Sequence, residues 1–149
     1  MQLNNIPTLN ELFEVFPLKF PSPFRLTDSY GDAISETLPF SGLQWNEVDC
    51  DLIKNHWEAP SFFSPEAFHY YLPAYIICSK DIDDMLSLPL ENIINTLEWW
   101  DERWDIFTKV QLEIVLKWIA WLKANSEANT LDKLGLERSY DALLGKINK

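Results

Sequence analysis

Residues 62–76 read FFSPEAFHYYLPAYI, and this stretch predicts a helix with a clear start and an interrupted middle. Ser64 is a suitable N-cap, and Pro65 then takes the first helical position, where its missing N–H would have been unpaired in any case. Pro73 removes one backbone hydrogen bond from the helix, and its ring clashes with the carbonyl of His69, at roughly 3 kcal/mol. The stretch therefore predicts either a helix that stops before Pro73 and restarts there, or one helix that bends.

The bend at Pro73 has two interpretations, and the sequence leaves both open. In the structural one, it wraps the helix around aromatic neighbours in the core. In the functional one, it presents aromatic and imidazole side chains at a pocket, whose expected lining is His69, Tyr70, Tyr71 and Trp100.

The same stretch resembles an uncharacterised family of small bacterial α-helical proteins, a domain of unknown function. The resemblance rests on an FxSPEAFxYYLP pattern between Phe62 and Pro73, and on a later FTxxQ helix start formed by Phe107, Thr108 and Gln111. It covers residues 60–123 and implies a helical fold. The family has no established activity, so the resemblance implies no reaction.

The rest of the chain predicts an all-α fold in a single domain over residues 1–149. Apolar residues recur at helical spacing, and no run of strict alternation indicates a strand. We expect five to seven helices around a central apolar helix at 108–124, which begins with a Thr108–Gln111 capping box. Residues 1–45, broken by prolines, should form an irregular wrapping segment with short helices at 8–16 and 31–38, and residues 46–149 the helical body.

Within that body, four further helices are expected. One begins after Asn46 as N-cap and is closed by Pro60, one is the helix after Ser64, one begins near Pro89, and the last occupies the stretch LERSYDALLGKI at the end of the chain. Capping residues and prolines mark most of these boundaries.

The net charge is −11, and it is unevenly distributed. Residues 1–60 carry nine acidic and three basic side chains, residues 61–105 nine and two, and residues 106–149 five and seven, which gives −6, −7 and +2. Such a surface repels nucleic acids and anionic lipid, and it attracts a basic protein partner. The longest apolar stretch, residues 114–122, contains Lys117 and is shorter than the ~20 residues of a membrane span, so no membrane association is predicted.

An acidic row is predicted on the helix that carries the Trp99–Trp100 pair. Its members are Glu98, Asp101, Glu102 and Asp105, whose spacing places them within an arc of about 100° on one helix. The row is either the solvated face of an amphipathic helix or a ridge that binds lysine and arginine side chains of a partner.

The remaining chemistry-bearing residues predict no catalytic, metal or cofactor site. No glycine-rich phosphate loop, nucleophile elbow or zinc-binding helix motif is present. Cys50 and Cys78 form no CxxC motif, and with no export signal at the N-terminus we expect a cytoplasmic protein with two free thiols.

Together these features favour a non-enzymatic acidic binding protein, of the immunity or inhibitor type, that neutralises a basic toxin domain by occlusion. The alternative is a helical module that binds a small molecule at the Pro73 bend. A third hypothesis is an enzyme that uses His56 or His69 as a base beside a carboxylate.

Overall fold

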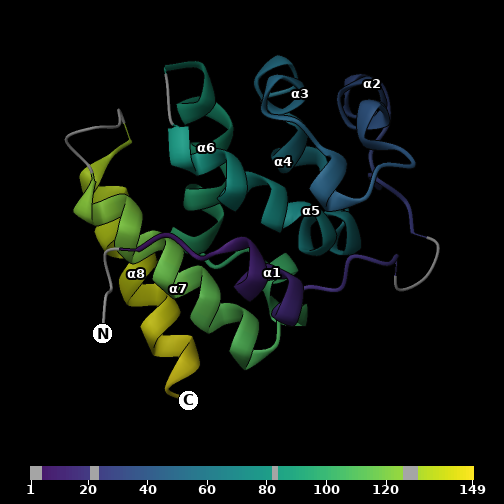
Figure 1. The fold of residues 1–149 in the computed structure, drawn as a ribbon. Coiled ribbons are helices and arrows are strands. Elements are labelled where there is room, and N and C mark those ends of the chain that lie inside the picture. The colour runs from purple at the N-terminus through teal and green to yellow at the C-terminus, as the bar shows by residue number, and fades with distance from the viewer. Residues whose placement is uncertain (1–4, 21–23, 82–83, 126–130) are drawn as a thin grey trace.

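The computed structural model describes residues 5–20, 24–81, 84–125 and 131–149, and these confirm the all-α fold (Figure 1). The described chain forms eight α-helices and four short 3-10 helices. The α-helices are α1 Leu9–Val15, α2 Asp32–Thr37, α3 Cys50–Asn55, α4 Ala59–Phe62, α5 Pro65–Cys78, α6 Asp84–Glu98, α7 Lys109–Ala124 and α8 Lys133–Ile147. The 3-10 helices are η1 Leu38–Phe40, η2 Trp45–Glu47, η3 Ser79–Asp81 and η4 Glu102–Ile106.

Helix α5 is the most enclosed element of the core. It runs without interruption from Pro65 to Cys78, so of the two predicted alternatives the stop and restart at Pro73 is wrong, and one helix passes through the buried Pro73. Ten of its 14 residues are buried, on every side of the helix. Because the aromatic neighbours contribute so much apolar area, the penalty of the internal proline is offset by packing.

Ser64 explains the start of α5 and the course of the chain before α2. Its hydroxyl accepts a hydrogen bond from the N–H of Ala67 at 3.2 Å, as an N-cap does, and donates to the carbonyl of Arg25. The N–H of Ser64 donates to the carbonyl of Leu26 at 2.8 Å, and an isolated antiparallel bridge pairs Thr27 with Phe63. The same short stretch therefore begins α5 and anchors residues 25–27.

Helix α7 begins as predicted and is tied to two other helices by one side chain. Thr108 and Gln111 form the expected capping box, with bonds of 3.2 and 3.0 Å. The Gln111 carboxamide also accepts from Nε2 of His69 at 2.8 Å and donates to the carbonyl of Val15 at 3.1 Å. Gln111 is buried, so its amide, whose oxygen and nitrogen both have partners, fixes α5 and α1 to the start of α7.

The N-terminal segment lies across the helical body, and α1 packs on α7 (Figure 1). Lys117 of α7 forms an ion pair with Glu11 at 2.8 Å, and this hydrogen bond lowers the pKa of the Glu11 carboxyl. Helices α6 and α8 pack beside each other and α8 also packs on α7. Within the described residues, no helix combines the length and apolar character needed to cross a bilayer.

Besides α4, which was not predicted, and α8, which begins at Lys133 and not at Leu136, two helices differ from the sequence prediction. The helix expected after Asn46 is instead split into η2 and α3, because Asp49 is the N-cap of α3 and accepts from the N–H of Leu52 at 2.8 Å. Helix α6 begins at Asp84 and passes through Pro89, where a start was expected. In both cases a capping or proline signal was assigned to the wrong residue of a correctly predicted helical region.

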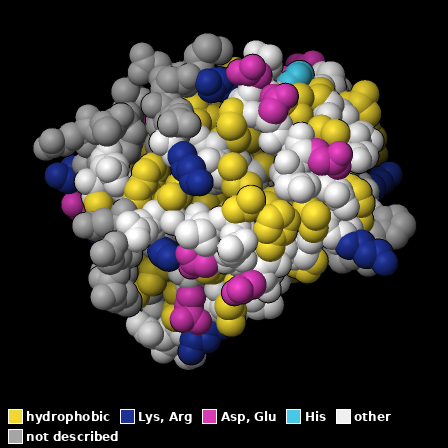
Figure 2. Space-filling model, in the orientation of Figure 1, with side chains coloured by type: hydrophobic (Ala, Val, Ile, Leu, Met, Phe, Trp, Pro, Cys, Tyr) yellow, Lys and Arg dark blue, Asp and Glu magenta, His cyan; other side chains and the backbone are white. Residues whose placement is uncertain are grey.

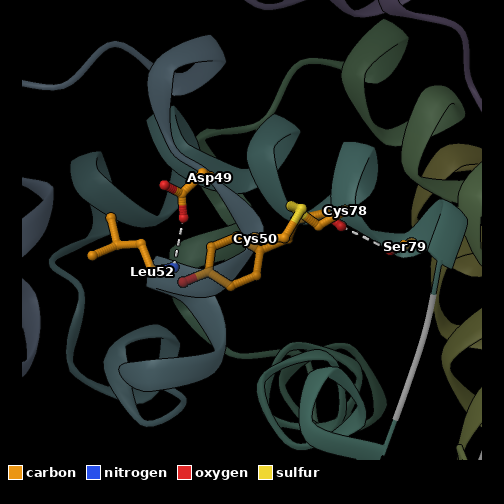
Figure 3. The surroundings of a disulfide bond; sticks show 6 residues. Asp49, Cys50, Leu52, Cys78 and Ser79 are labelled. Atoms are coloured by element: carbon orange, nitrogen blue, oxygen red, sulfur yellow. Dashed lines mark hydrogen bonds between the residues drawn. A yellow bond between two sulfur atoms is a disulfide. The ribbon is translucent and has the colours of Figure 1, made fainter.

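A disulfide joins Cys50, the first residue of α3, to Cys78, the last residue of α5 (Figure 3). The two Cα atoms lie 5.6 Å apart although the residues are separated by 28 positions. The prediction of two free thiols is therefore wrong. Sequence spacing alone carried no information on how α3 packs against the end of α5.

Two tyrosines one helical turn apart on α5 should respond in opposite directions to loss of the hydroxyl. Tyr71 donates to the carbonyls of Phe40 and Leu43, both at 2.8 Å, whereas the buried Tyr75 hydroxyl has no hydrogen-bond partner among the described residues. Tyr71→Phe should lower the free energy of unfolding by about 1–2 kcal/mol, and Tyr75→Phe should raise it by about 1 kcal/mol. Urea unfolding at pH 7 measures both free energies. Equal destabilisation by the two variants would contradict the difference in hydrogen bonding between the two hydroxyls.

Candidate protein-binding surface

The expected acidic row does not lie on one helix. Helix α6 ends at Glu98, and Trp100 has a left-handed backbone with φ of 52°, which ends a helix. Asp101 is then the N-cap of η4 and accepts from the N–H of Arg103 at 2.9 Å. The prediction of a continuous helix from Glu98 to Asp105 is therefore wrong.

Three of the four acidic side chains in this row have partners inside the protein. Glu98 pairs with Arg138 at 2.9 Å, Asp101 pairs with Arg103 at 3.0 Å, and Asp105 accepts from the indole N–H of Trp100 at 2.9 Å. Glu102 is exposed. A partner-binding role for Glu98, Asp101, Glu102 and Asp105 stays a prediction. Three of these four carboxylates already accept hydrogen bonds from other residues of the protein.

Arg103 connects η4 to the residues around the start of α5, a role that was not predicted from the sequence. One guanidinium nitrogen donates to the carbonyls of Pro60 and Phe63 at 2.8 and 3.0 Å, and the group lies 4.5 Å from the ring centre of Phe68. Burial raises the pKa of Asp101, but hydrogen bonds from Arg103 outweigh that effect and leave this pKa below its ordinary value. The sequence signal was indirect: Arg103 is one of only two basic residues in 61–105.

The expected pocket at Pro73 does not assemble from the four residues assigned to it. Tyr70 and Tyr71 are buried, and their hydroxyls bond to backbone carbonyls of the N-terminal segment and of residues 40–43. His69 packs edge-on against Phe107 at 4.5 Å and bonds to Gln111. Trp100 contacts other residues, namely Trp104, Asp105 and Lys146. Tyr70 and Tyr71 thus fill the core and do not line an opening.

The other histidine also has a structural contact. Nδ1 of His56 lies 3.3 Å from a carboxylate oxygen of Glu36, and the second oxygen accepts from the N–H of Glu58 at 3.3 Å. This carboxylate therefore links α2 to the residues between α3 and α4. Among the residues that the structure describes, no group of three or more His, Cys, Asp and Glu side chains could hold a metal ion.

A second group of acidic side chains lies in residues 27–66, which we call the acidic end. It contains α2, α3 and α4, and its sequence carries eight acidic side chains against one basic side chain, Lys54. In Figure 1, α2 and α3 lie on the side of the molecule away from α7 and α8, whose region carries a charge of +2. Figure 2 shows several carboxylates over the part of this face where α3 lies.

The acidic end also bears an exposed apolar stripe, formed by Tyr30, Ile34 and Leu38. These residues are spaced by four, and their exposed fractions are 88%, 47% and 59%. Together with residues 25–29 and Thr37, they line a cleft of about 300 Å³. Apolar side chains this exposed and this close together are typical of a contact surface.

The stripe was not predicted from the sequence, although its spacing of four was visible. Only Ile34 lies within α2, because Tyr30 precedes the helix and Leu38 follows it. The spacing does not tell whether these side chains are buried or exposed. Only the packing of α2 decides this, because Ala33 and Thr37 are the residues of α2 that turn inward and are buried.

Comparison with known proteins places the chain in a family without assigning a function. A family model described as "Family of unknown function (DUF6714)" matches residues 22–140. The chain belongs to this family. The match includes the FFSPEAFHYYLPAYI stretch and extends beyond residues 60–123 on both sides, so it contains the acidic end and the apolar stripe. No curated protein and no solved structure matches the chain.

Proposed function

We propose that this protein is a non-enzymatic acidic binding protein of the immunity or inhibitor type, which neutralises a basic toxin domain by covering its functional surface. The observation that carries the proposal is the acidic end, whose sequence contains eight acidic side chains and only one basic side chain, a lysine. The exposed apolar stripe lies within the same region.

This combination suits a protein partner for two physical reasons. A surface of one sign attracts a partner of the opposite sign and accelerates their encounter. Exposed aromatic and aliphatic side chains then supply contacts that slow dissociation once water has left the interface. The same charge opposes binding to nucleic acids and anionic membranes.

The alternative, a small-molecule site at the Pro73 bend, receives less support from the geometry. Its two expected tyrosines are buried, with hydroxyls bonded to backbone carbonyls. A ligand there would have to displace packed core side chains. The protein-binding proposal needs no such rearrangement, because the acidic end is already exposed.

The compartment in which the protein acts is a separate part of the proposal. A cytoplasmic location stays a prediction, and an immunity-type protein would work there against a toxin that reaches the cytoplasm. Disulfides are uncommon in that reducing compartment. Alkylation of thiols in freshly lysed host cells, followed by mass spectrometry, measures whether Cys50 and Cys78 are joined in the cell.

Neutralising the acidic end should slow partner binding more than neutralising the opposite end. The test variant is Asp28→Asn, Asp32→Asn and Asp51→Asn, three exposed residues at the acidic end. A pull-down from the native host identifies the bound basic protein, and surface plasmon resonance then measures its association rate. At low salt we expect a decrease of about tenfold, because electrostatic attraction changes association rates by 10–10³-fold.

A matched variant carries the same change in charge elsewhere: Glu113→Gln, Glu137→Gln and Asp141→Asn, all exposed on α7 and α8. Its association rate should stay within about twofold of wild type, since it leaves the acidic end intact. Equal effects of the two triple variants would contradict a binding surface at the acidic end. A native pull-down with no stoichiometric basic protein, at low or at high salt, would contradict the proposed function itself.

A further inference from the structure

We propose that the apolar stripe and its cleft are the docking site for one segment of a basic protein partner, a segment that presents an aliphatic or aromatic side chain flanked by lysine or arginine. This inference rests on the proposed function and adds to it the place and the chemistry of contact. The apolar side chain would enter the cleft beside Ile34 and Leu38, and a flanking cation would pair with the carboxylate of Asp28, which lines the cleft.

The cleft is built from segments that are held in place. The carbonyls of Arg25 and Leu26 are bonded to Ser64, and the N–H of Ser29 donates to the hydroxyl of Thr27 at 3.1 Å. Gly31, with φ of 67° at the N-cap of α2, makes the turn that presents Tyr30. A left-handed φ of this kind favours glycine. The site is therefore formed before a partner arrives.

The exposure of the stripe favours a macromolecular partner over a small ligand. A typical small-molecule pocket encloses most of the surface of its ligand. The cleft of about 300 Å³ has lining residues that are largely exposed. Tyr30 and Leu38 line the cleft and are still 88% and 59% exposed, so both are accessible from solvent. A surface that approaches from solvent can bury them, which is how aromatic anchors act at protein interfaces.

The negative charge of the acidic end favours a basic protein segment over a second copy of this chain. A second copy of this chain would bring two acidic ends together, and like charges facing each other are unfavourable. A basic segment would instead meet Asp28, Asp32 and the rest of the acidic end. Arg25 is the one basic residue that lines the cleft, and it opposes such a segment. Arg25→Gln should therefore strengthen binding.

Peptide binding tests the inference without knowledge of the natural partner. The probe is a short fluorescein-labelled peptide in which leucines on one helical face lie between lysines, and fluorescence anisotropy measures its affinity. Tyr30→Ser and Leu38→Ser should each weaken binding about tenfold, the size of effect seen at interface anchors, without altering the charge of the protein. Leu134→Ser, at a 52% exposed leucine of α8, is the matched control and should bind as wild type does.

Further probes separate the outcomes. A peptide with serine for every leucine should bind more weakly and be insensitive to the stripe variants, and one with glutamate for every lysine should not bind. Wild-type affinity in Tyr30→Ser and Leu38→Ser would overturn the docking site. If the triple variant at the acidic end still slowed binding of the natural partner, the proposed function would stand.

Two controls complete the design. Thermal unfolding should be unchanged in Tyr30→Ser, whose side chain is almost fully exposed, so that this variant reports on binding even if Leu38→Ser is destabilised. Sedimentation of the protein alone should show no dimer. A dimer that Tyr30→Ser dissociates would overturn the inference in favour of a second copy of this chain.

Discussion

Arg103→Met should lower the free energy of unfolding by about 3 kcal/mol. The Arg103 side chain is only 11% exposed and forms hydrogen bonds to the carboxylate of Asp101 and to the carbonyls of Pro60 and Phe63. Methionine keeps much of the apolar stem but leaves these acceptors without their donor. Urea unfolding at pH 7, followed by tryptophan fluorescence, measures the difference.

Arg138→Met is the matched control, because it removes another arginine from an arginine–carboxylate pair. Arg138 is 58% exposed where it meets Glu98, and exposed ion pairs contribute about 0–1 kcal/mol. We therefore expect a change within that range. Equal losses in Arg103→Met and Arg138→Met would show that the contacts of Arg103 with residues 60 and 63 do not stabilise the fold.

Acid should reduce the difference between wild type and Arg103→Met. The pKa of Asp101 in the folded protein lies below its unfolded value of about 3.9, so the stability from this pair is present above that pH. It is lost as the pH falls through the lower folded pKa. In the variant, burial without the guanidinium should raise the pKa of Asp101, so the difference between the two proteins should shrink at low pH. It should not vanish, because the bonds of Arg103 to the carbonyls of Pro60 and Phe63 do not titrate.

Opening the Cys50–Cys78 disulfide should lower the free energy of unfolding by about 3–4 kcal/mol. The bond closes a loop between residues 28 positions apart, and the loss of such a cross-link increases the conformational freedom of the unfolded chain by an amount of that order. For a chain of this size the melting temperature should fall by roughly 10 °C. Thermal unfolding with and without a phosphine reductant measures the shift.

The variants Cys50→Ala and Cys78→Ala separate this effect from other actions of the reductant. Each should melt at the temperature of the reduced wild type, and neither should respond further to the phosphine. An oxidised wild type that melts at the same temperature as the reduced one would mean that the cross-link contributes nothing to stability.

Helix starts were predictable where a side chain and its spacing specify a hydrogen bond. Thr108 with Gln111 and Ser64 with Pro65 are of this kind, and both predictions are confirmed. Helix ends and interruptions were less predictable. Pro73 and Pro89 remain inside helices, because burial against neighbours outweighs a local penalty that the sequence alone makes visible.

Of the properties of the candidate surface, only its negative charge was predicted from the sequence. The excess of acidic residues before position 106 could be counted, but the partners of Glu98, Asp101 and Asp105 depend on Arg138, Arg103 and Trp100, which the fold brings to them. The exposure of Tyr30 and Leu38 likewise depends on how α2 packs. Charge is a property of composition, whereas the freedom of a charge or an apolar side chain to meet a partner is a property of tertiary structure.

The bond between Gln111 and Val15 also bears on how the chain folds as it is made. The two residues are 96 positions apart, and ribosomes add roughly 5–20 residues per second, so Gln111 is synthesised about 5–20 s after Val15. Phe16, which is buried in the finished protein, also packs against His69 and Phe107, but α1 completes its packing only when α7 has been made. Translation, and not the intrinsic speed of helix formation, therefore sets the moment at which the N-terminal segment joins the fold.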